Sequence, residues 1–172
     1  MMLFQGKYRK EIDTPLGKMI AGADESGICF LQFADHTVLE ISSEEHLSEN
    51  ELSESYFKIL AKELSEYFRG SLQKFSVPLS VQGTDFQKKV WQKLLEIPYA
   101  STKTYREQAA EIGNPRAVRA AANANGKNKI IILIPCHRIV GSSGKLTGYN
   151  GGIDRKMKLL ELEKRASKKL LQ

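Results

Sequence analysis

The residues best suited to chemistry lie in the run 134–140, Ile-Pro-Cys-His-Arg-Ile-Val. The run follows the apolar stretch 130–133 and precedes two glycines, Gly141 and Gly144. This order predicts a cysteine at the end of a buried strand, just before a glycine-rich loop. A thiol next to a histidine and an arginine is typical of a reactive cysteine that meets an anionic partner.

Cys136 needs help to act as a nucleophile, because a thiol with a pKa of ~8.5 is only a few per cent thiolate at neutral pH. His137 is adjacent, but successive side chains of an extended chain point to opposite sides. We therefore expect a water to bridge the imidazole and the sulfur. The other ring nitrogen needs an acceptor, and Glu163 is the candidate, beside the apolar face of a predicted C-terminal helix. That face consists of Leu159, Leu160, Ala166 and Leu170.

Local chemistry alone leaves a second interpretation open for each of these residues. A lone cysteine such as Cys136 is more often an inert buried thiol. A carboxylate such as Glu163 can simply lie at the edge of an apolar face. The rest of the chain has to decide between the two interpretations.

The composition is that of an ordinary globular protein, with 41% hydrophobic and 27% charged residues among 172. The longest purely apolar run, 130–134, is far too short to span a membrane, and the N-terminus has no secretory pattern. Two cysteines, Cys29 and Cys136, cannot form a disulfide framework, so we expect a reducing, cytoplasmic setting. His36 and His46 stand alone and solvated, and no Cys/His cluster has zinc spacing, so no metal site is expected.

The net charge of +6 hides a strong asymmetry along the chain. Residues 1–81 carry 8 Lys and Arg against 13 Asp and Glu, a net charge of −5, whereas residues 82–172 carry 18 against 7, a net charge of +11. A basic half that also contains the candidate thiol indicates a polyanionic partner. The alternative is that the basic half binds nothing, as many small basic domains do.

The elements of the first half predict a small domain over residues 1–81. Residues 18–23 and 28–33 indicate a β-hairpin around a four-residue turn, 24–27. A helix is expected over 51–69, capped by Asn50 and stopped by Gly70. Its apolar residues have four-residue spacing: Tyr56, Leu60, Leu64 and Phe68. Residues 75–81 look extended, and Pro78 keeps them at an edge.

The second half, 82–172, is punctuated by helix signals. Two capping boxes, Thr84 with Gln87 and Thr104 with Glu107, each open a helix. The second helix stops at Gly113, and Asn114-Pro115 supplies an N-cap and a first-turn proline for a third helix that runs to about Ala124. Two short helices joined by a glycine turn predict a helix-turn-helix.

The third helix has two different faces. One is apolar and small, with Val118, Ala121 and Ala122. The other is polar, with Arg116, Arg119 and Asn123. A helix with polar side chains among alanines can approach a nucleic-acid groove closely. A merely solvated face is an equally good interpretation of this helix by itself.

From Thr84 to about Glu163 the chain closely resembles the O6-alkylguanine-DNA alkyltransferase family. The matching positions agree in order and spacing: Thr84-Asp85-Phe86-Gln87, Val90-Trp91, Ile97-Pro98-Tyr99, Thr104-Tyr105, Gly113-Asn114-Pro115, Ala117 to Ala120, Asn128, Pro135-Cys136-His137-Arg138, Gly148-Tyr149 and Gly151-Gly152. The first half fits the variable domain of that family. Ala100 stands where the family often has glycine, and Lys129 where many members have proline.

The resemblance implies direct reversal of DNA damage, with the alkyl group of O6-alkylguanine passing irreversibly to Cys136. O4-alkylthymine is expected as a further substrate. His137, through water, and Glu163 would activate the thiol. Tyr105 would donate a proton or hydrogen bond to the base, and Asn128 would brace the turn that carries the cysteine.

The resemblance also assigns the contacts with DNA and with the flipped base. Arg119 would enter the duplex as a finger in place of the lesion nucleotide, from the minor groove and with little regard to sequence. The other residues expected to contact DNA are Arg116, Asn123, Thr104 and Arg138. The expected base pocket is lined by Ile139, Tyr149, Asn150 and Gly151.

The expected architecture is therefore α+β: an N-terminal antiparallel sheet with a helix (1–81) that supports a C-terminal winged helix-turn-helix-like domain (82–172). The expected partner is double-stranded DNA with an O6-alkylguanine, bound by a monomer without a cofactor or a membrane. Two other classes remain as alternatives: a lesion binder that performs no chemistry, and a sequence-specific winged-helix regulator. Neither requires Cys136, His137 and Glu163 together.

Overall fold

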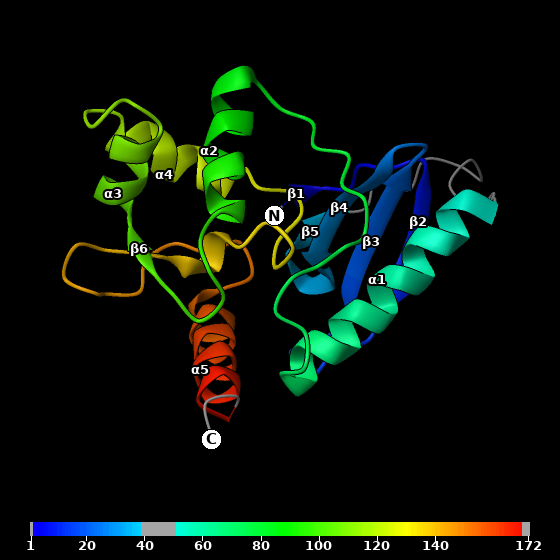
Figure 1. Ribbon diagram of the computed structural model, residues 1–172. Coiled ribbons are helices and arrows are strands. Elements are labelled where there is room, and N and C mark those ends of the chain that lie inside the picture. Colours follow the sequence, from blue (N-terminus) through cyan, green and yellow to red (C-terminus); the bar gives the residue numbers. More distant parts are fainter. Residues whose placement is uncertain (1, 39–50, 170–172) are drawn as a thin grey trace. The chain divides into compact units, whose positions relative to one another are not determined.

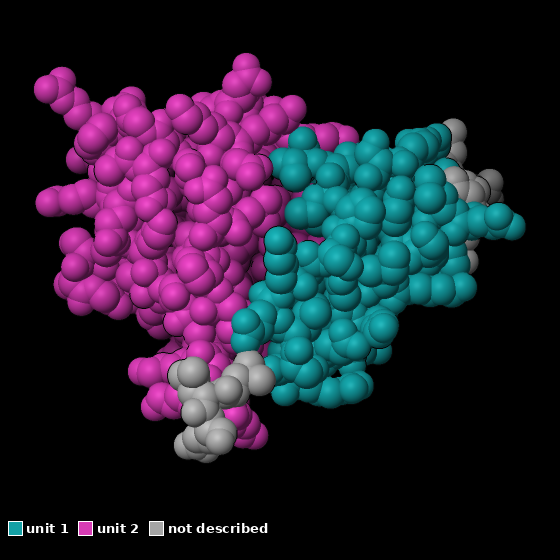
Figure 2. All heavy atoms as spheres, in the orientation of Figure 1, with its two compact units in different colours: residues 1–81 teal, residues 82–172 magenta. Residues whose placement is uncertain are grey.

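The computed structural model describes residues 2–38 and 51–169. The chain divides into two compact units, residues 1–81 and residues 82–172 (Figures 1 and 2). The first unit holds an antiparallel sheet with a helix, and the second is mostly helical, so the predicted α+β class is confirmed. In the described part of the chain, no helix is long and apolar enough to cross a membrane.

A three-stranded antiparallel sheet is the centre of the first unit. Its strands are β2 (Tyr8–Ile12), β3 (Met19–Asp24) and β4 (Gly27–Phe33), in the order β2-β3-β4. The predicted hairpin is confirmed as β3–β4, but the prediction that its turn has four residues is wrong. Asp24 pairs with Gly27, so only two residues form the loop. The sequence did not predict β2, because three polar residues, 9–11, separate its two buried ends.

The remaining strands of the first unit are minor. Strand β1 (Met2–Leu3) pairs in parallel with β5 (Thr37–Val38), which follows the short helix η1 (Ala34–His36). The segment 75–81 forms a single bridge, between Leu79 and Ile28, instead of a strand. The Pro78 carbonyl accepts the Ile28 N–H at 2.8 Å, so the segment lies at an edge, as a proline requires.

Helix α1 (Glu51–Arg69) has the predicted bounds, and Gly70 follows it with a φ of +79°. Its buried face differs from the predicted one. Phe57, Leu60, Leu64 and Tyr67 are buried, whereas Tyr56 and Phe68 are only partly so. A strict four-residue spacing drifts around a helix of 3.6 residues per turn, and the face follows the mixed three- and four-residue spacing instead. Asn50, His46 and Leu170 lie outside the described residues.

Among the described residues of the second unit, four α-helices occur: α2 (Asp85–Leu95), α3 (Tyr105–Glu111), α4 (Val118–Gly126) and α5 (Ile153–Lys169). Both predicted capping boxes are confirmed, at Thr84 and at Thr104. The pair α3–α4 makes the helix-turn-helix. Two buried amides join its helices, because Gln108 and Asn125 donate to each other at 3.1 and 2.7 Å.

The third helix begins three residues later than predicted, at Val118 instead of Pro115. Asn114 and Pro115 form a turn instead, with the Ala117 N–H donating to the Asn114 carbonyl at 2.9 Å. The Asn114 side chain accepts the Arg116 N–H at 3.2 Å, which is how asparagine commonly stabilises a turn. Helix α4 therefore begins at Val118, and Arg116 precedes it.

The prediction of a buried strand before the cysteine is also wrong. Residues 130–134 are buried, but they form a tight turn in which Ile132 has a φ of +72°. The short helix η2 (Cys136–Arg138) follows, and then β7 (Ile139–Val140), which pairs in parallel with β6 (Lys103–Thr104). A short apolar run does not distinguish a strand from another buried segment, and here the turn geometry decided.

Candidate active site

Cys136 begins the helix η2 and is buried, at 6% exposed. The Asn128 side chain holds the cysteine and the turn before it. Its Nδ2 lies 3.2 Å from the Cys136 Sγ and donates to the Ile134 carbonyl at 2.8 Å, while its Oδ1 accepts the Ile130 N–H at 2.9 Å. A β-branched residue such as Ile132 at positive φ is strained. Asn128 therefore fixes both ends of a strained turn and points a donor at the sulfur.

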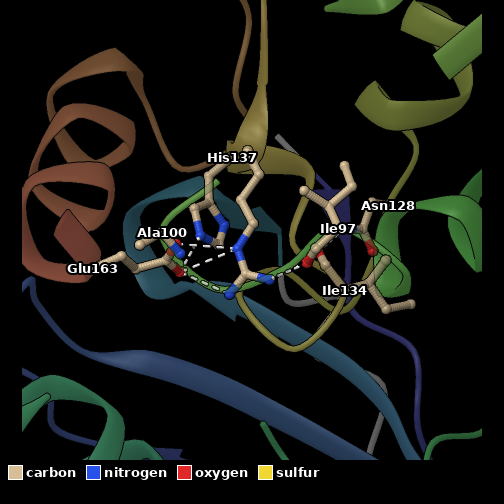
Figure 3. A network of polar contacts seen from close by, with 7 residues as sticks. Ile97, Ala100, Asn128, Ile134, His137 and Glu163 are labelled. Atoms are coloured by element: carbon tan, nitrogen blue, oxygen red, sulfur yellow. Dashed lines mark hydrogen bonds and ion pairs between the residues drawn. The ribbon is translucent and has the colours of Figure 1, made fainter. Parts of the chain in front are cut away.

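His137 and Glu163 face each other in the interior, both fully buried (Figure 3). The His137 Nε2 lies 3.0 Å from the Glu163 Oε1. Glu163 comes from helix α5, and its second oxygen accepts the Ala100 N–H at 3.0 Å. The apolar stripe of α5 thus brings a carboxylate to the residue after the cysteine.

Arg138 corrects the expected DNA contact at this position. It is 7% exposed and donates to both oxygens of Glu163, at distances from 2.9 to 3.3 Å. It also donates to the Ile97 carbonyl at 2.7 Å, and its guanidinium lies 5.6 Å from the centre of the Tyr99 ring. The 3₁₀ turn directs His137 and Arg138 to the same carboxylate. Arg138 therefore binds Glu163 in the interior and does not point to the surface.

The charges of this network are fixed by its contacts. Burial by itself would raise the pKa of Glu163, but the hydrogen bonds from His137 and Arg138 and the charge of Arg138 outweigh it and hold that pKa at about 2. Burial lowers the pKa of His137. A neutral imidazole that donates through Nε2 leaves Nδ1 as an acceptor. That Nδ1 is buried and has no hydrogen-bond partner among the described residues, which leaves it available as a base.

The thiol is protonated at rest. Burial raises the pKa of Cys136 to about 11, although the Asn128 hydrogen bond and the Lys156 charge both lower it. A nucleophilic cysteine requires the thiolate, and the His137 Nδ1, which could take up the proton, belongs to the next residue. No contact joins the imidazole directly to the sulfur among the described residues.

The residues predicted to contact DNA divide into two groups. Arg116, Arg119 and Asn123 are exposed, the last two on α4. Thr104 is half-buried, and its hydroxyl belongs to the capping box, with the Glu107 N–H at 3.2 Å and a Glu107 oxygen at 2.7 Å. Three surface side chains are therefore free to reach a partner, and Thr104 serves first to start α3.

The predicted pocket residues lie on β7 and on the loop before α5. Ile139 and Gly151 are buried, and the Tyr149 ring lies edge-on to His137 with 6.3 Å between ring centres. The Asn150 side chain turns toward α4 instead, because its Nδ2 donates to the Gly126 carbonyl at 2.8 Å. Tyr105 begins α3 directly after β6, the strand that pairs with β7 just beyond the cysteine.

Sequence reasoning missed three residues that shape the site: Lys156, Tyr99 and Ala100. Lys156 is fully buried, and a signal for it existed, because it falls on the α5 stripe with Leu159 and Glu163. Ala100 has a φ of +61°, a conformation that glycine adopts without strain. No group of three or more potential metal ligands occurs among the described residues.

Two family models match the chain. The model of the 6-O-methylguanine DNA methyltransferase ribonuclease-like domain covers residues 7–81. The model of the DNA-binding domain of the same methyltransferase covers residues 85–165. Together they account for nearly all of both units.

Individual proteins are similar over almost their whole length. A methylated-DNA–protein-cysteine methyltransferase of Methanosarcina barkeri is 45% identical over 157 residues, 91% of this chain and 96% of that protein. The protein of that name from Mycobacterium leprae is 44% identical over 155 residues, 90% of this chain and 91% of its own. The crystal structure of Mycobacterium tuberculosis OGT in complex with DNA is similar with a TM-score of 0.81 and 42% sequence identity. The match covers 92% of this chain and 94% of the OGT chain.

Proposed function

The chain belongs to the 6-O-methylguanine DNA methyltransferase family, and from this membership we propose that it repairs O6-alkylguanine in DNA through Cys136. Its activity is that of a methylated-DNA–protein-cysteine methyltransferase, and its partner is DNA. The observation that supports the choice of residue is the Asn128 amide 3.2 Å from the Cys136 sulfur, together with the buried pair that the next residue, His137, forms with Glu163.

The proposed reaction is an in-line displacement at the alkyl carbon. The Cys136 sulfur forms the new S–C bond while the C–O6 bond breaks, and the electron pair of that bond stays on the guanine oxygen. The thiol proton leaves to His137 through a water, and the base takes up a proton from Tyr105. The products are S-alkylcysteine and unmodified guanine, and the proton taken up by His137 returns through solvent to the Tyr105 phenolate, so atoms and charge balance without a cofactor.

His137 suits the role of base in this scheme. Its Nε2 donates to an ionised Glu163, which fixes the proton there and leaves Nδ1 as the acceptor. Once His137 is protonated, the Glu163 carboxylate stabilises the imidazolium. No group in the proposed site hydrolyses a thioether, so we expect one alkyl group per protein molecule and no turnover.

The lesion base has to leave the helix, because Cys136 is buried and cannot reach a stacked base. Arg119, exposed on α4, is proposed to fill the vacated position from the minor groove, with Arg116 and Asn123 on nearby backbone. Ile139, Tyr149, Gly151 and the backbone at Asn150 would receive the flipped base. Because phosphate contacts supply most of the affinity, binding should depend little on sequence.

We further propose a monomer that acts in the cytoplasm, since one chain carries the whole proposed site and a free thiol requires a reducing compartment. O4-alkylthymine is proposed as a second substrate, because the scheme needs only an alkyl ether on an exocyclic oxygen. The first unit is proposed to support the second, which contains every residue of the reaction scheme.

The test is intact-protein mass spectrometry after mixing with a duplex that contains one O6-methylguanine. We expect a gain of one methylene equivalent, located on Cys136, with a ceiling of one per chain and none in Cys136→Ala. Lesion-selective binding without a mass change would contradict the proposal and indicate a recognition protein. A parallel duplex with O4-methylthymine tests the second substrate.

A further inference from the structure

Helix α4 ends two residues before Asn128, and side chains from other parts of the second unit hold that end. The last carbonyls of a helix have no partner within the helix itself. In α4 the Ala124 carbonyl accepts the Trp91 Nε1–H of α2 at 2.9 Å. The Gly126 carbonyl accepts the side-chain amide of Asn150 at 2.8 Å. The carbonyl end of α4 is therefore held from outside the helix.

Asn150 belongs to the pocket loop, residues 141–152, which connects β7 to α5. Its Nδ2 also lies 3.4 Å from the Asn128 carbonyl. An amide nitrogen carries two hydrogens, so one side chain can donate to both carbonyls. Asn150 thus joins the pocket loop to the end of α4 and to the residue whose own side chain lies 3.2 Å from the Cys136 sulfur.

Other bonds give the pocket loop its shape. The Gly152 N–H donates to the Tyr149 carbonyl at 3.0 Å, and the Thr147 carbonyl accepts the Lys156 Nζ at 2.7 Å. These partners belong to the loop itself and to α5, whereas the Asn150 bond reaches a different helix. Removal of the Asn150 amide should therefore leave the shape of the loop and release its position relative to α4.

The spacing between α4 and the pocket loop matters because each serves one side of base flipping. Arg119 on α4 is proposed to fill the gap in the duplex, and the pocket loop is proposed to receive the base that leaves it. The DNA backbone connects the two places, so it limits how far the base can reach. A misplacement of 1 Å costs a reaction about 100-fold in rate.

We propose that Asn150 is a positioning residue whose side-chain amide fixes the pocket loop to the end of α4 and so sets where the flipped base stops relative to Cys136. The role rests on the proposed function of Cys136 and adds a residue to it. It belongs to the side chain, whereas the backbone of the same residue lines the proposed pocket.

Two variants separate the hydrogen bonds from the shape of the side chain: Asn150→Ala removes the amide, and Asn150→Asp keeps its shape but has no hydrogen to donate. In single-turnover transfer from an O6-methylguanine duplex, we expect the saturated rate of both variants to fall by about tenfold or more. The DNA concentration at half-maximal rate should change by less than about twofold in Asn150→Ala, because the lost interaction acts after binding. Ser143→Ala, exposed in the same loop, should react like the wild type.

A saturated rate of Asn150→Asp equal to that of the wild type would overturn the positioning role. So would a change confined to the half-maximal DNA concentration, since Asn150 would then only contribute to binding. Absence of transfer in the wild type would contradict the proposed function together with the role that rests on it. The attachment of the loop itself is decided by a measurement without DNA.

Hydrogen exchange followed by mass spectrometry reports that attachment. In Asn150→Ala, peptides from the pocket loop and from the end of α4 should exchange about fivefold faster, since the loss of one hydrogen bond shifts a local opening equilibrium by that order. Peptides from α3 should keep the wild-type rate. Unchanged exchange in the pocket loop would overturn the attachment, and so would faster exchange across α3 as well, because Asn150 would then support the whole unit.

A measurement on the wild type remains decisive in case neither variant folds. The side-chain NH₂ protons of Asn150 should exchange with solvent about fivefold or more slowly than those of Asn123, which is exposed on α4. Proton NMR of ¹⁵N-labelled protein measures both rates. Equal rates for the two amides would overturn the attachment.

Discussion

Glu163 links two side chains at the residue scale: it accepts from His137 and neutralises Arg138. Its pKa of about 2 lies below the ordinary value of 4.5. A carboxyl whose pKa is lower in the folded state stabilises the fold above the unfolded pKa, and this contribution disappears as the pH falls toward the folded pKa. The carboxylate therefore contributes to stability near neutral pH and loses that contribution between about pH 5 and pH 2.

Glu163→Gln should impair both transfer and stability. Removal of one partner of a buried ion pair costs about 3–5 kcal/mol, because Arg138 is left without a counter-charge. Without the carboxylate the general base is weakened, and such groups contribute about 100-fold or more to a rate. Single-turnover kinetics and urea unfolding measure the two effects. Glu161→Gln, exposed on the same helix, is the control. Equal unfolding free energies of Glu163→Gln and wild type at pH 7 would contradict the assigned network.

Arg119 permits a sharper test of base flipping than of binding. If its guanidinium fills the vacated stack, Arg119→Ala should lower the transfer rate at saturating lesion duplex by about 100-fold, since flipping costs a few kcal/mol. Arg116→Ala should weaken DNA binding and leave that saturated rate unchanged. Rapid-quench measurements over a range of DNA concentrations separate the two parameters. A saturated rate of Arg119→Ala equal to that of wild type would rule out the finger.

At the scale of elements, the segment between α2 and β6 stores strain next to the site. Ala100 has a φ of +61°, and its N–H holds the second oxygen of Glu163. The left-handed conformation costs an alanine about 1–2 kcal/mol, and glycine loses about 0.5–1 kcal/mol more chain entropy on folding. The positive φ of Ala100 places its N–H where it donates to the buried Glu163 carboxylate, and this hydrogen bond offsets the conformational cost.

Ala100→Gly should therefore raise the free energy of unfolding by about 0.5–1 kcal/mol and keep transfer intact. The matched control is Ala110→Gly, at an exposed position inside α3, which should lower the same quantity by about 1 kcal/mol. Urea unfolding of both proteins at pH 7 measures the difference. A loss of stability in Ala100→Gly comparable to that of the control would show that the positive φ carries no strain.

Elements with a side-chain signal at their ends could be predicted from the sequence, and turns set by tertiary contacts could not. Thr84 and Thr104 start helices because their capping boxes are local. The turn at 130–134 depends on the Asn128 amide, which only the folded chain brings to it. In the same way, residue type singled out Cys136, His137 and Glu163, which make up the proposed site. The inward direction of Arg138 follows from the 3₁₀ turn, which the sequence did not predict.

At the scale of the whole molecule, charge is distributed unevenly between the two units. The second unit carries a net charge of +11 and the first −5. Counterions released from DNA give sequence-independent affinity that falls steeply with salt. The acidic groups of α3 are internally engaged, Glu107 in the capping box and Glu111 with Lys103, so they oppose a phosphate backbone less.

Binding to an undamaged duplex should therefore be governed by salt. About five phosphate contacts would give a slope near −4.5 in log affinity against log salt, a loss of roughly 500-fold between 50 and 200 mM. Arg116→Ala should reduce the slope by about 1, whereas Lys74→Ala, exposed in the acidic unit, should leave it unchanged. Fluorescence anisotropy measures the slope, and a slope near zero would contradict a phosphate-dominated interface. Transfer at saturating DNA should stay constant over the same range, because the Cys136, His137 and Glu163 side chains are buried and screened little by salt.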